Sequence, residues 1–383
     1  MTRRSIARWV TGVLVIASFT GTACAQIKIG VLMPLSGKGA AYGQHQQVAL
    51  QMALEDIAKA GGIKGEKVEA LAFDTRGDNT EAINLTRKLA YNDKVLAIVG
   101  PFFSAEVEVA FPIALAARVP IITASAAKPG IAAKARPYGF RNALASDQMD
   151  GQLVDAWLKE HPKVKSVVIL TDVKDALTKA DGTFVFPAAL KARDIKILDN
   201  ISFQTGDIDY AAQVTRAKDL RPDGIVVAAN YNEGGNVLRE IRKQGLTQPV
   251  LGALGMSEPK FIEIAGPAAE GVMGVMPFWP GRPDPRTAAF VKEFTKRAKI
   301  SQPNNTDALM YDTLFLLKHC IEKSGVTNKP ADLAADRDRI RGCIDNVEAF
   351  PGVVGPITFD KQGDAMLKPQ VMRVDKGAWN ALR

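Results

Sequence analysis

The segment IKIGVLMPL, residues 27–35, is an apolar run followed by a stretch with helical spacing, residues 42–60. A nearly continuous apolar run is typical of a strand in a parallel sheet whose two faces are both covered by helices. Gly61-Gly62 ends the helical stretch, because glycine readily adopts the backbone conformation that terminates a helix. The segment therefore predicts a strand followed by a helix, the repeating unit of a parallel α/β sheet.

The same alternation continues along the chain in two series, which meet near Asp147. Two series of strands and helices predict two lobes, each built on a parallel sheet. Ligands of open parallel sheets bind beyond the carboxyl ends of the strands, so a cleft between two facing lobes is the expected site. Further strands are expected at residues 68–73, 95–99 and 120–123, then at 167–170, 195–201, 225–228 and 250–254, and finally at 356–359 and 370–374.

The N-terminus has the layout of a secretory signal peptide. Three arginines within the first eight residues precede an apolar run, residues 9–19, and small residues follow up to Ala25. This pattern predicts export with cleavage after Ala25, and the run is too short to span a bilayer as an ordinary helix. Lipoprotein anchoring through Cys24 is the less favoured alternative, because Gly21 stands where a bulky aliphatic residue is usual. We therefore expect a periplasmic mature protein that lacks residues 1–25.

Charge and motifs argue against several functional classes. The chain carries 49 lysines and arginines and 41 acids, with a formal net charge of +8, and the basic residues are scattered among the acids. Without a basic stripe, nucleic-acid binding is not expected. The sequence has no G-x-S-x-G elbow, no H-E-x-x-H motif and no phosphate loop, and its histidines lack partners at metal-ligand spacing. We therefore expect no enzyme, cofactor or metal site, a hydrolase with an unfamiliar carboxylate pair being the alternative.

Two cysteines remain after the expected cleavage, Cys320 and Cys343. In an oxidising compartment they can form a disulfide that closes a short loop, worth about 3 kcal/mol in the chain-entropy model. A pair of buried free thiols is the alternative, since neither cysteine belongs to a C-x-x-C or zinc-like spacing.

Several stretches, taken in their order and spacing, resemble the leucine/isoleucine/valine-binding family of periplasmic solute receptors. Residues 29–43 resemble the first strand and loop of that family, and residues 119–122 resemble its fourth strand. Residues 238–246 and 264–271 resemble parts of its second lobe. The resemblance implies a receptor without catalytic residues that closes around its ligand by a hinge motion. It also implies that the closed form docks on the membrane permease of an ABC importer.

The resemblance also implies the architecture. The fold would be α/β, with two Rossmann-like lobes on parallel central sheets, three crossovers between the lobes and the ligand cleft between them. Lobe one would comprise residues 26–146 and 278–357, and lobe two residues 147–277 and 358–383. We expect a monomer.

The resemblance places the first group of ligand contacts in the loops of lobe one. Tyr42 matches an aromatic position that packs on the ligand, and Ser104 matches a serine whose hydroxyl and backbone N–H hold the ligand carboxylate. Ser104 also precedes a predicted helix, whose free N–H groups and dipole favour an anion. The alternatives are a plain helix cap at Ser104 and a loop aromatic at Tyr42. Ser125, Ala126 and Ala127 match a segment that offers backbone groups, although amino-acid binders carry threonine in place of Ala127.

The second lobe departs further from the family pattern. Amino-acid binders pair the ligand ammonium with a glutamate, and the match puts Leu254 at that position. Asn230 replaces a ligand-lining aromatic residue, with Tyr231 beside it. Asp147 and Trp279, near the hinge, are further candidates. Asp147 could instead bind water or cap a helix, and Trp279 could instead pack in the hinge.

These departures bear on the ligand. An ammonium buried in a closed cleft without a counter-charge costs several kcal/mol, so ligands with a free α-amine are disfavoured. The sequence therefore predicts a receptor for a small carboxylate without an α-amine, either aromatic or branched aliphatic. The alternatives are a true branched-chain amino-acid receptor, with the amine held by backbone carbonyls and Asn230, and a ligand-sensing module of the same fold.

Overall fold

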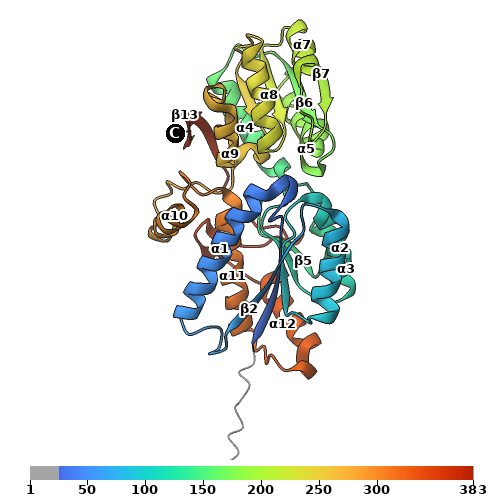
Figure 1. Cartoon of the computed structure of the whole chain (residues 1–383), viewed down its shortest axis with the longest axis vertical. Coiled ribbons are helices and arrows are strands. Elements are labelled where there is room, and N and C mark those ends of the chain that lie inside the picture. The colour runs from blue at the N-terminus through green and yellow to red at the C-terminus, as the bar shows by residue number, and fades with distance from the viewer. Residues whose placement is uncertain (1–25, 383) are drawn as a thin grey trace, which may run out of the picture.

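The computed structural model describes residues 26–382, so the expected signal peptide, residues 1–25 with Cys24, lies outside the described part of the chain. The described residues form two lobes that follow one another along the long axis of the molecule (Figure 1). The first lobe contains the N-terminal strands and several late helices, whereas the last strands of the chain belong to the second lobe.

The first lobe is built on a five-stranded sheet in the order β2-β1-β3-β4-β5, and all of its strand pairs are parallel. The apolar run that opens the chain forms β1, which is buried and pairs with strands on both sides. The strands are β1 (Ile27–Met33), β2 (Val68–Asp74), β3 (Ala97–Val99), β4 (Ile121–Thr123) and β5 (Gly139–Arg141).

Helices cover both faces of this sheet (Figure 1). On one face lie α1 (Ala40–Lys59), α10 (Pro285–Ala298) and α11 (Asn305–Lys323), and on the other lie α2 (Asn79–Arg87) and α3 (Ser104–Ala116). Gly61 and Gly62 follow α1 with positive φ angles of 89° and 80°, the conformation that favours glycine and ends a helix.

The second lobe is built on a seven-stranded sheet in the order β14-β13-β10-β9-β8-β6-β7. The five strands from β10 to β7 are parallel, and β13 and β14 add an antiparallel edge next to β10. Helices α7, α8 and α9 pack on one face, and α4 and α6 pack on the other. The strands are β6 (Ser166–Asp172), β7 (Lys196–Phe203), β8 (Gly224–Ala228), β9 (Val250–Gly252), β10 (Met273–Met276), β13 (Gln370–Asp375) and β14 (Ala378–Ala381). The helices are α4 (Asp150–Glu160), α5 (Ala176–Ala180), α6 (Phe186–Lys191), α7 (Ala211–Asp219), α8 (Tyr231–Lys243) and α9 (Pro259–Ala265).

The predicted fold class, two α/β lobes on largely parallel sheets, is confirmed. The late strand expected at residues 356–359 is present as the shorter β12 (Gly355–Ile357). It pairs only with β11 (Phe350–Gly352), in a two-stranded antiparallel ribbon outside both large sheets. The exact lobe boundaries given above stay predictions.

The late helices of the first lobe are covalently linked. Cys320 of α11 forms a disulfide with Cys343 of α12 (Leu333–Asp345), and their Cα atoms lie 5.4 Å apart. Within residues 26–382, no helix combines the length and the apolar character needed to cross a bilayer.

Candidate functional site

A small cavity lies where the strand-end loops of the two lobes meet. Its walls come from α1 and the loops after β3 and β4 in lobe one, and from the loops after β6, β8 and β9 in lobe two. The cavity volume is about 40 Å³, enough for only a few waters. The lobes must therefore part to admit an organic ligand. Of the residues expected to hold the ligand, six line this cavity: Tyr42, Ser104, Ser125, Ala126, Asn230 and Leu254.

The other four expected residues do not line the cavity. Ala127 is fully buried in the core of the second lobe, and Tyr231 packs edge-on against Tyr42 with ring centroids 4.9 Å apart. Asp147 is exposed in the short helix at residues 146–148. Trp279 is half-buried against the apolar core of the second lobe.

The start of α3 forms the polar end of the cavity. Ser104 is the first residue of this helix and is buried, and its Oγ accepts a hydrogen bond from the backbone N–H of Lys128 at 3.3 Å. The Ser104 hydroxyl hydrogen is therefore free to be donated into the cavity, beside the unpaired N–H groups of a first helical turn. The hydroxyl of Ser125 instead donates to the backbone carbonyl of Phe102 at 2.8 Å. A carboxylate at this end can therefore be held by Ser104 and the N-terminus of α3.

Glu106 lies in the first turn of α3, and its protonation state affects the net charge at this part of the cavity. Its carboxylate accepts a hydrogen bond from the backbone N–H of Phe103 at 2.9 Å. Burial raises the pKa of Glu106, which more than offsets the hydrogen bonds that lower it. A raised pKa favours the neutral acid, which reduces the repulsion that a second negative charge would meet here.

Aromatic rings form one wall of the cavity. Tyr42 stacks on Phe102 with ring centroids 4.7 Å apart, and Phe103 meets Phe102 edge-on at 5.0 Å. The Tyr42 hydroxyl donates a hydrogen bond across the cleft to the carbonyl of Gly255 at 2.5 Å. This wall suits a flat or branched apolar group, because such a group gains both apolar burial and ring contacts.

The second lobe presents Leu254 and Asp175 to the cavity. Leu254 is 7% exposed. Asp175 caps α5, and its Oδ1 accepts hydrogen bonds from the backbone N–H groups of Leu177 and Thr178 at 3.0 and 3.1 Å. Burial raises the pKa of Asp175. Asp175 is thus a cavity-lining acid that sequence reasoning did not single out, although it lies in a segment expected to reach the cleft.

Other lining residues also escaped the sequence interpretation. Phe102 and Phe103 precede α3, and Leu177 follows β6, all in strand-end loops whose importance the alternation did predict. Asn305 and Thr306 begin α11, a helix of the late segment with no strand directly before it. No signal based on strand ends could have identified them.

A larger groove lies on the outer side of lobe one. Its volume is about 640 Å³, and its apolar floor includes Phe290, Tyr311, Phe315 and Phe350. The groove is formed by α1, α10, α11 and β11, so it is not at the carboxyl ends of the parallel strands. The smaller cavity between the lobes, where the strands end, is therefore the candidate ligand site.

The family model described as periplasmic binding protein matches residues 26–378. The chain belongs to the periplasmic binding protein family. It is 28% identical over 339 residues to the leucine-, isoleucine-, valine-, threonine- and alanine-binding protein of Pseudomonas aeruginosa, covering 88% of this chain and 87% of that one. It is 25% identical over 360 residues to the Leu/Ile/Val-binding protein of Escherichia coli strain K12, covering 91% and 90%.

Solved structures of this family superpose on most of the chain. The leucine-binding protein LivK of Thermotoga maritima has a TM-score of 0.82 at 27% identity, covering 93% of this chain and 98% of that chain. A solute-binding protein of R. palustris in complex with benzoate has a TM-score of 0.82 at 20% identity, covering 93% and 95%, which shows the shared fold.

Proposed function

We propose that this periplasmic binding protein is the monomeric receptor of an ABC importer and binds a small carboxylate without an α-amine, aromatic or branched aliphatic. Its partner is then the importer's membrane permease, and its compartment is the periplasm. One observation carries the proposal: the cavity between the lobes is lined by the start of α3 from lobe one and by the uncharged Leu254 from lobe two.

The energetics of an ammonium support the absence of an amine. Leu254 offers no charge and no hydrogen bond. An ammonium that loses its water beside an aliphatic side chain is penalised by several kcal/mol unless another group pairs with it. Each 1.4 kcal/mol lowers affinity about tenfold, so an amino acid would bind weakly unless a second acid compensates.

Asp175 favours a second candidate function, a receptor for branched-chain amino acids. Only its Oδ1 is engaged by the two backbone N–H groups of α5, so its other oxygen could pair with an ammonium. Against this, burial raises the pKa of Asp175 and thus favours its neutral form. Some relatives are named as amino-acid-binding proteins, among them the protein of Pseudomonas aeruginosa described above.

Matched pairs of ligands that differ only in the α-amine test the proposal. Leucine is paired with 4-methylpentanoate and phenylalanine with 3-phenylpropanoate, and benzoate is added as a compact aromatic acid. Thermal unfolding of the mature protein with each compound should show stabilisation by the amine-free acid of each pair, amounting to about 2.7 kcal/mol at a hundredfold excess over Kd. A larger increase in melting temperature with leucine than with 4-methylpentanoate would overturn the proposal.

Asp175→Asn separates the two candidate functions. Asparagine keeps the capping oxygen that Leu177 and Thr178 need, while the charge is removed. Titration calorimetry should show unchanged or tighter binding of the amine-free acids by this variant. A loss of about 100-fold or more in leucine affinity would instead support the amino-acid receptor.

A further inference from the structure

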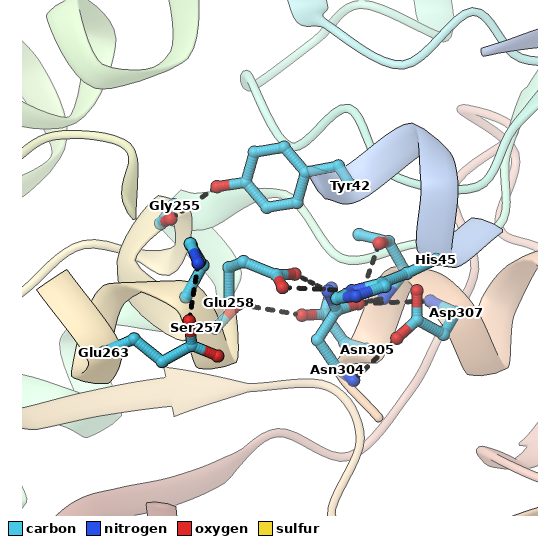
Figure 2. A network of polar contacts seen from close by, with 11 residues as sticks. Tyr42, His45, Gly255, Ser257, Glu258, Glu263, Asn304, Asn305 and Asp307 are labelled. Carbon is cyan, nitrogen blue, oxygen red and sulfur yellow. Dashed lines mark hydrogen bonds and ion pairs between the residues drawn. The ribbon is translucent and has the colours of Figure 1, made fainter. Parts of the chain in front are cut away.

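A cluster of polar side chains joins the two lobes beside the cavity (Figure 2). His45 comes from α1, and Asn304 and Asp307 come from the start of α11, all in lobe one. Glu258 comes from lobe two, where it caps α9. We call these four residues, His45, Glu258, Asn304 and Asp307, the interlobe latch.

Glu258 is the residue of the latch that crosses between lobes. Its Oε1 lies 3.0 Å from Nδ1 of His45, and its Oε2 accepts a hydrogen bond from the side-chain amide of Asn304. The Glu258 side chain is fully buried, and that of His45 is 17% exposed. Next to the latch, the hydroxyl of Ser257 in lobe two donates a hydrogen bond to the side-chain oxygen of Asn305 in lobe one, at 3.1 Å. Both lobes are thus needed to assemble the environment of Glu258.

The latch buries more negative than positive charge. Asp307 is buried, and its Oδ2 accepts a hydrogen bond from the backbone N–H of Asn304 at 2.9 Å. Its Oδ1 has no hydrogen-bond partner among the described residues. Two ionised carboxylates beside a neutral imidazole would be strongly unfavourable in such a site. Protons bound by His45 or Asp307 reduce this excess of negative charge.

The surroundings of His45 are acidic on several sides. Glu258 and Glu263 face it from the second lobe and Asp307 faces it from α11. Glu263 is itself paired with Lys260 at 2.6 Å. From α10, Phe294 meets the imidazole edge-on at 6.4 Å and brings no charge.

These surroundings shift both titrating groups in the same direction. Burial lowers the pKa of His45, but the 3.0 Å contact with Glu258 and the charges of the three nearby carboxylates outweigh it, so the pKa is raised from its ordinary value of 6.5. Burial, reinforced by the charge of Glu258, raises the pKa of Asp307 well above its usual range. Opening the lobes removes Glu258 from both groups and admits water, so both pKa values fall toward their ordinary values. Closing therefore takes up protons.

We propose that closure of the lobes is coupled to proton uptake by the interlobe latch, so that the receptor holds its ligand more tightly in acidic than in alkaline surroundings. The coupling to ligand rests on the proposed function, whereas the coupling to closure does not. The added stability of the closed form is fully present below the pKa values of the open form. It is lost as the pH rises through the higher pKa values of the closed form.

Two measurements between pH 6 and pH 9 test the coupling. Small-angle scattering of the ligand-free mature protein should show a more open molecule as the pH rises. Benzoate, which is ionised throughout this range, should lose affinity by about tenfold per pH unit wherever one proton is linked to closure. Glu258→Gln keeps the size of the side chain but removes its charge, so benzoate affinity should fall less steeply with pH in this variant than in the wild-type protein, the burial of Asp307 being the part of the coupling that remains.

Asp312→Asn is the matched control. Asp312 is also a buried acid of α11, and burial raises its pKa to about 7. Its carboxylate accepts hydrogen bonds from the backbone N–H groups of Val353 and Val354, at 2.8 and 3.0 Å, within lobe one. This variant should keep the wild-type pH dependence of closure and affinity, because Asp312 does not bridge the lobes.

The outcomes separate this inference from the proposed function. A wild-type protein whose scattering and benzoate affinity are both independent of pH overturns the coupling but leaves the receptor function intact. If neither benzoate nor 3-phenylpropanoate binds at any pH, the proposed class of ligand is wrong. The scattering of the ligand-free protein then still tests whether closure is coupled to proton uptake. A wild-type slope retained by Glu258→Gln overturns the role of the latch. Should that variant fail to fold, as judged by circular dichroism, His45→Gln provides the same test.

Discussion

At the scale of single residues, two serines that line the cavity differ in what their hydroxyl groups bind. The Ser125 hydroxyl donates to the carbonyl of Phe102, whereas the Ser104 hydroxyl has no acceptor among residues 26–382. Hydrogen bonds to charged groups are worth about 1.5 to 3 kcal/mol. The two residues should therefore contribute unequally to carboxylate binding although both line the same cavity.

Ser104→Ala should weaken carboxylate binding by about 1 to 3 kcal/mol, because a charged oxygen loses a buried donor. Ser125→Ala is the matched variant, and it should change affinity by less than about 0.5 kcal/mol, since its hydroxyl serves the carbonyl of Phe102. Titration calorimetry with 4-methylpentanoate measures both. Equal losses for the two variants would contradict the assigned roles.

The strand pattern predicted the loops that meet at the cavity, and the family resemblance singled out Tyr42, Ser104 and Leu254 within them. These residues line the cavity, where parallel strands of both sheets end. Asp175 was missed because an aspartate just before a helix is common as a helix cap, so its residue type alone does not indicate a ligand contact. Tyr231 lies behind Tyr42, a relation set by packing across the cleft that no local pattern encodes.

At the scale of secondary-structure elements, the strands that form apolar runs were predictable, whereas the short edge strand β14 was not. Strands β6, β8 and β9 are apolar runs, and the sequence identified each within a few residues. Strand β14 was missed, because Ala378–Ala381 is a four-residue edge strand in which only Trp379 is buried. The sequence predicted a strand at the position of β12. It did not predict β11, because the pairing of β11 with β12 depends on where this hairpin packs in the folded protein.

The disulfide between α11 and α12 should stabilise lobe one measurably. It closes a loop with a sequence separation of 23 residues, for which loop-closure entropy gives about 3 kcal/mol. Cys343→Ala should lower the free energy of unfolding in urea by about that amount, with cysteine 343 chosen because its side chain is less buried than that of Cys320. Dithiothreitol should destabilise the wild-type protein and leave the variant unchanged. An equal response of both proteins to the reductant would show that the bond is not formed in solution.

At the scale of the whole molecule, the proposed closure of the lobes requires that the connections between them keep their place. The last connection, between β12 and β13, leaves lobe one and enters the sheet of lobe two. Before leaving, it forms backbone hydrogen bonds with Arg141 at the end of β5, from Arg141 N–H to Gly363 and from Ala365 N–H to Arg141, both at 2.8 Å. This connection is therefore fixed to the edge of the first sheet near the hinge.

The side chains of Arg141 and Asp364 strengthen the same attachment. Arg141 is fully buried, and its guanidinium donates to Asp364 at 2.5 Å and to the carbonyl of Lys128 at 2.8 Å. A buried ion pair adds little compared with apolar packing, but removal of one partner leaves an uncompensated buried charge. The pair therefore makes this attachment sensitive to a single substitution.

Asp364→Asn should lower the free energy of unfolding by about 3 to 5 kcal/mol, because the Arg141 charge stays buried without a counter-ion. The expected loss is read from urea unfolding of the mature protein. Asp155→Asn is the matched control: Asp155 pairs with Arg193, but its side chain is 65% exposed, so its removal should cost less than about 1 kcal/mol. Since the backbone N–H of Lys128 also bonds Ser104, Asp364→Asn should in addition weaken carboxylate binding more than Asp155→Asn does. Similar stability losses for the two variants would mean that water reaches Arg141 and that the attachment at the hinge is looser than the structure indicates.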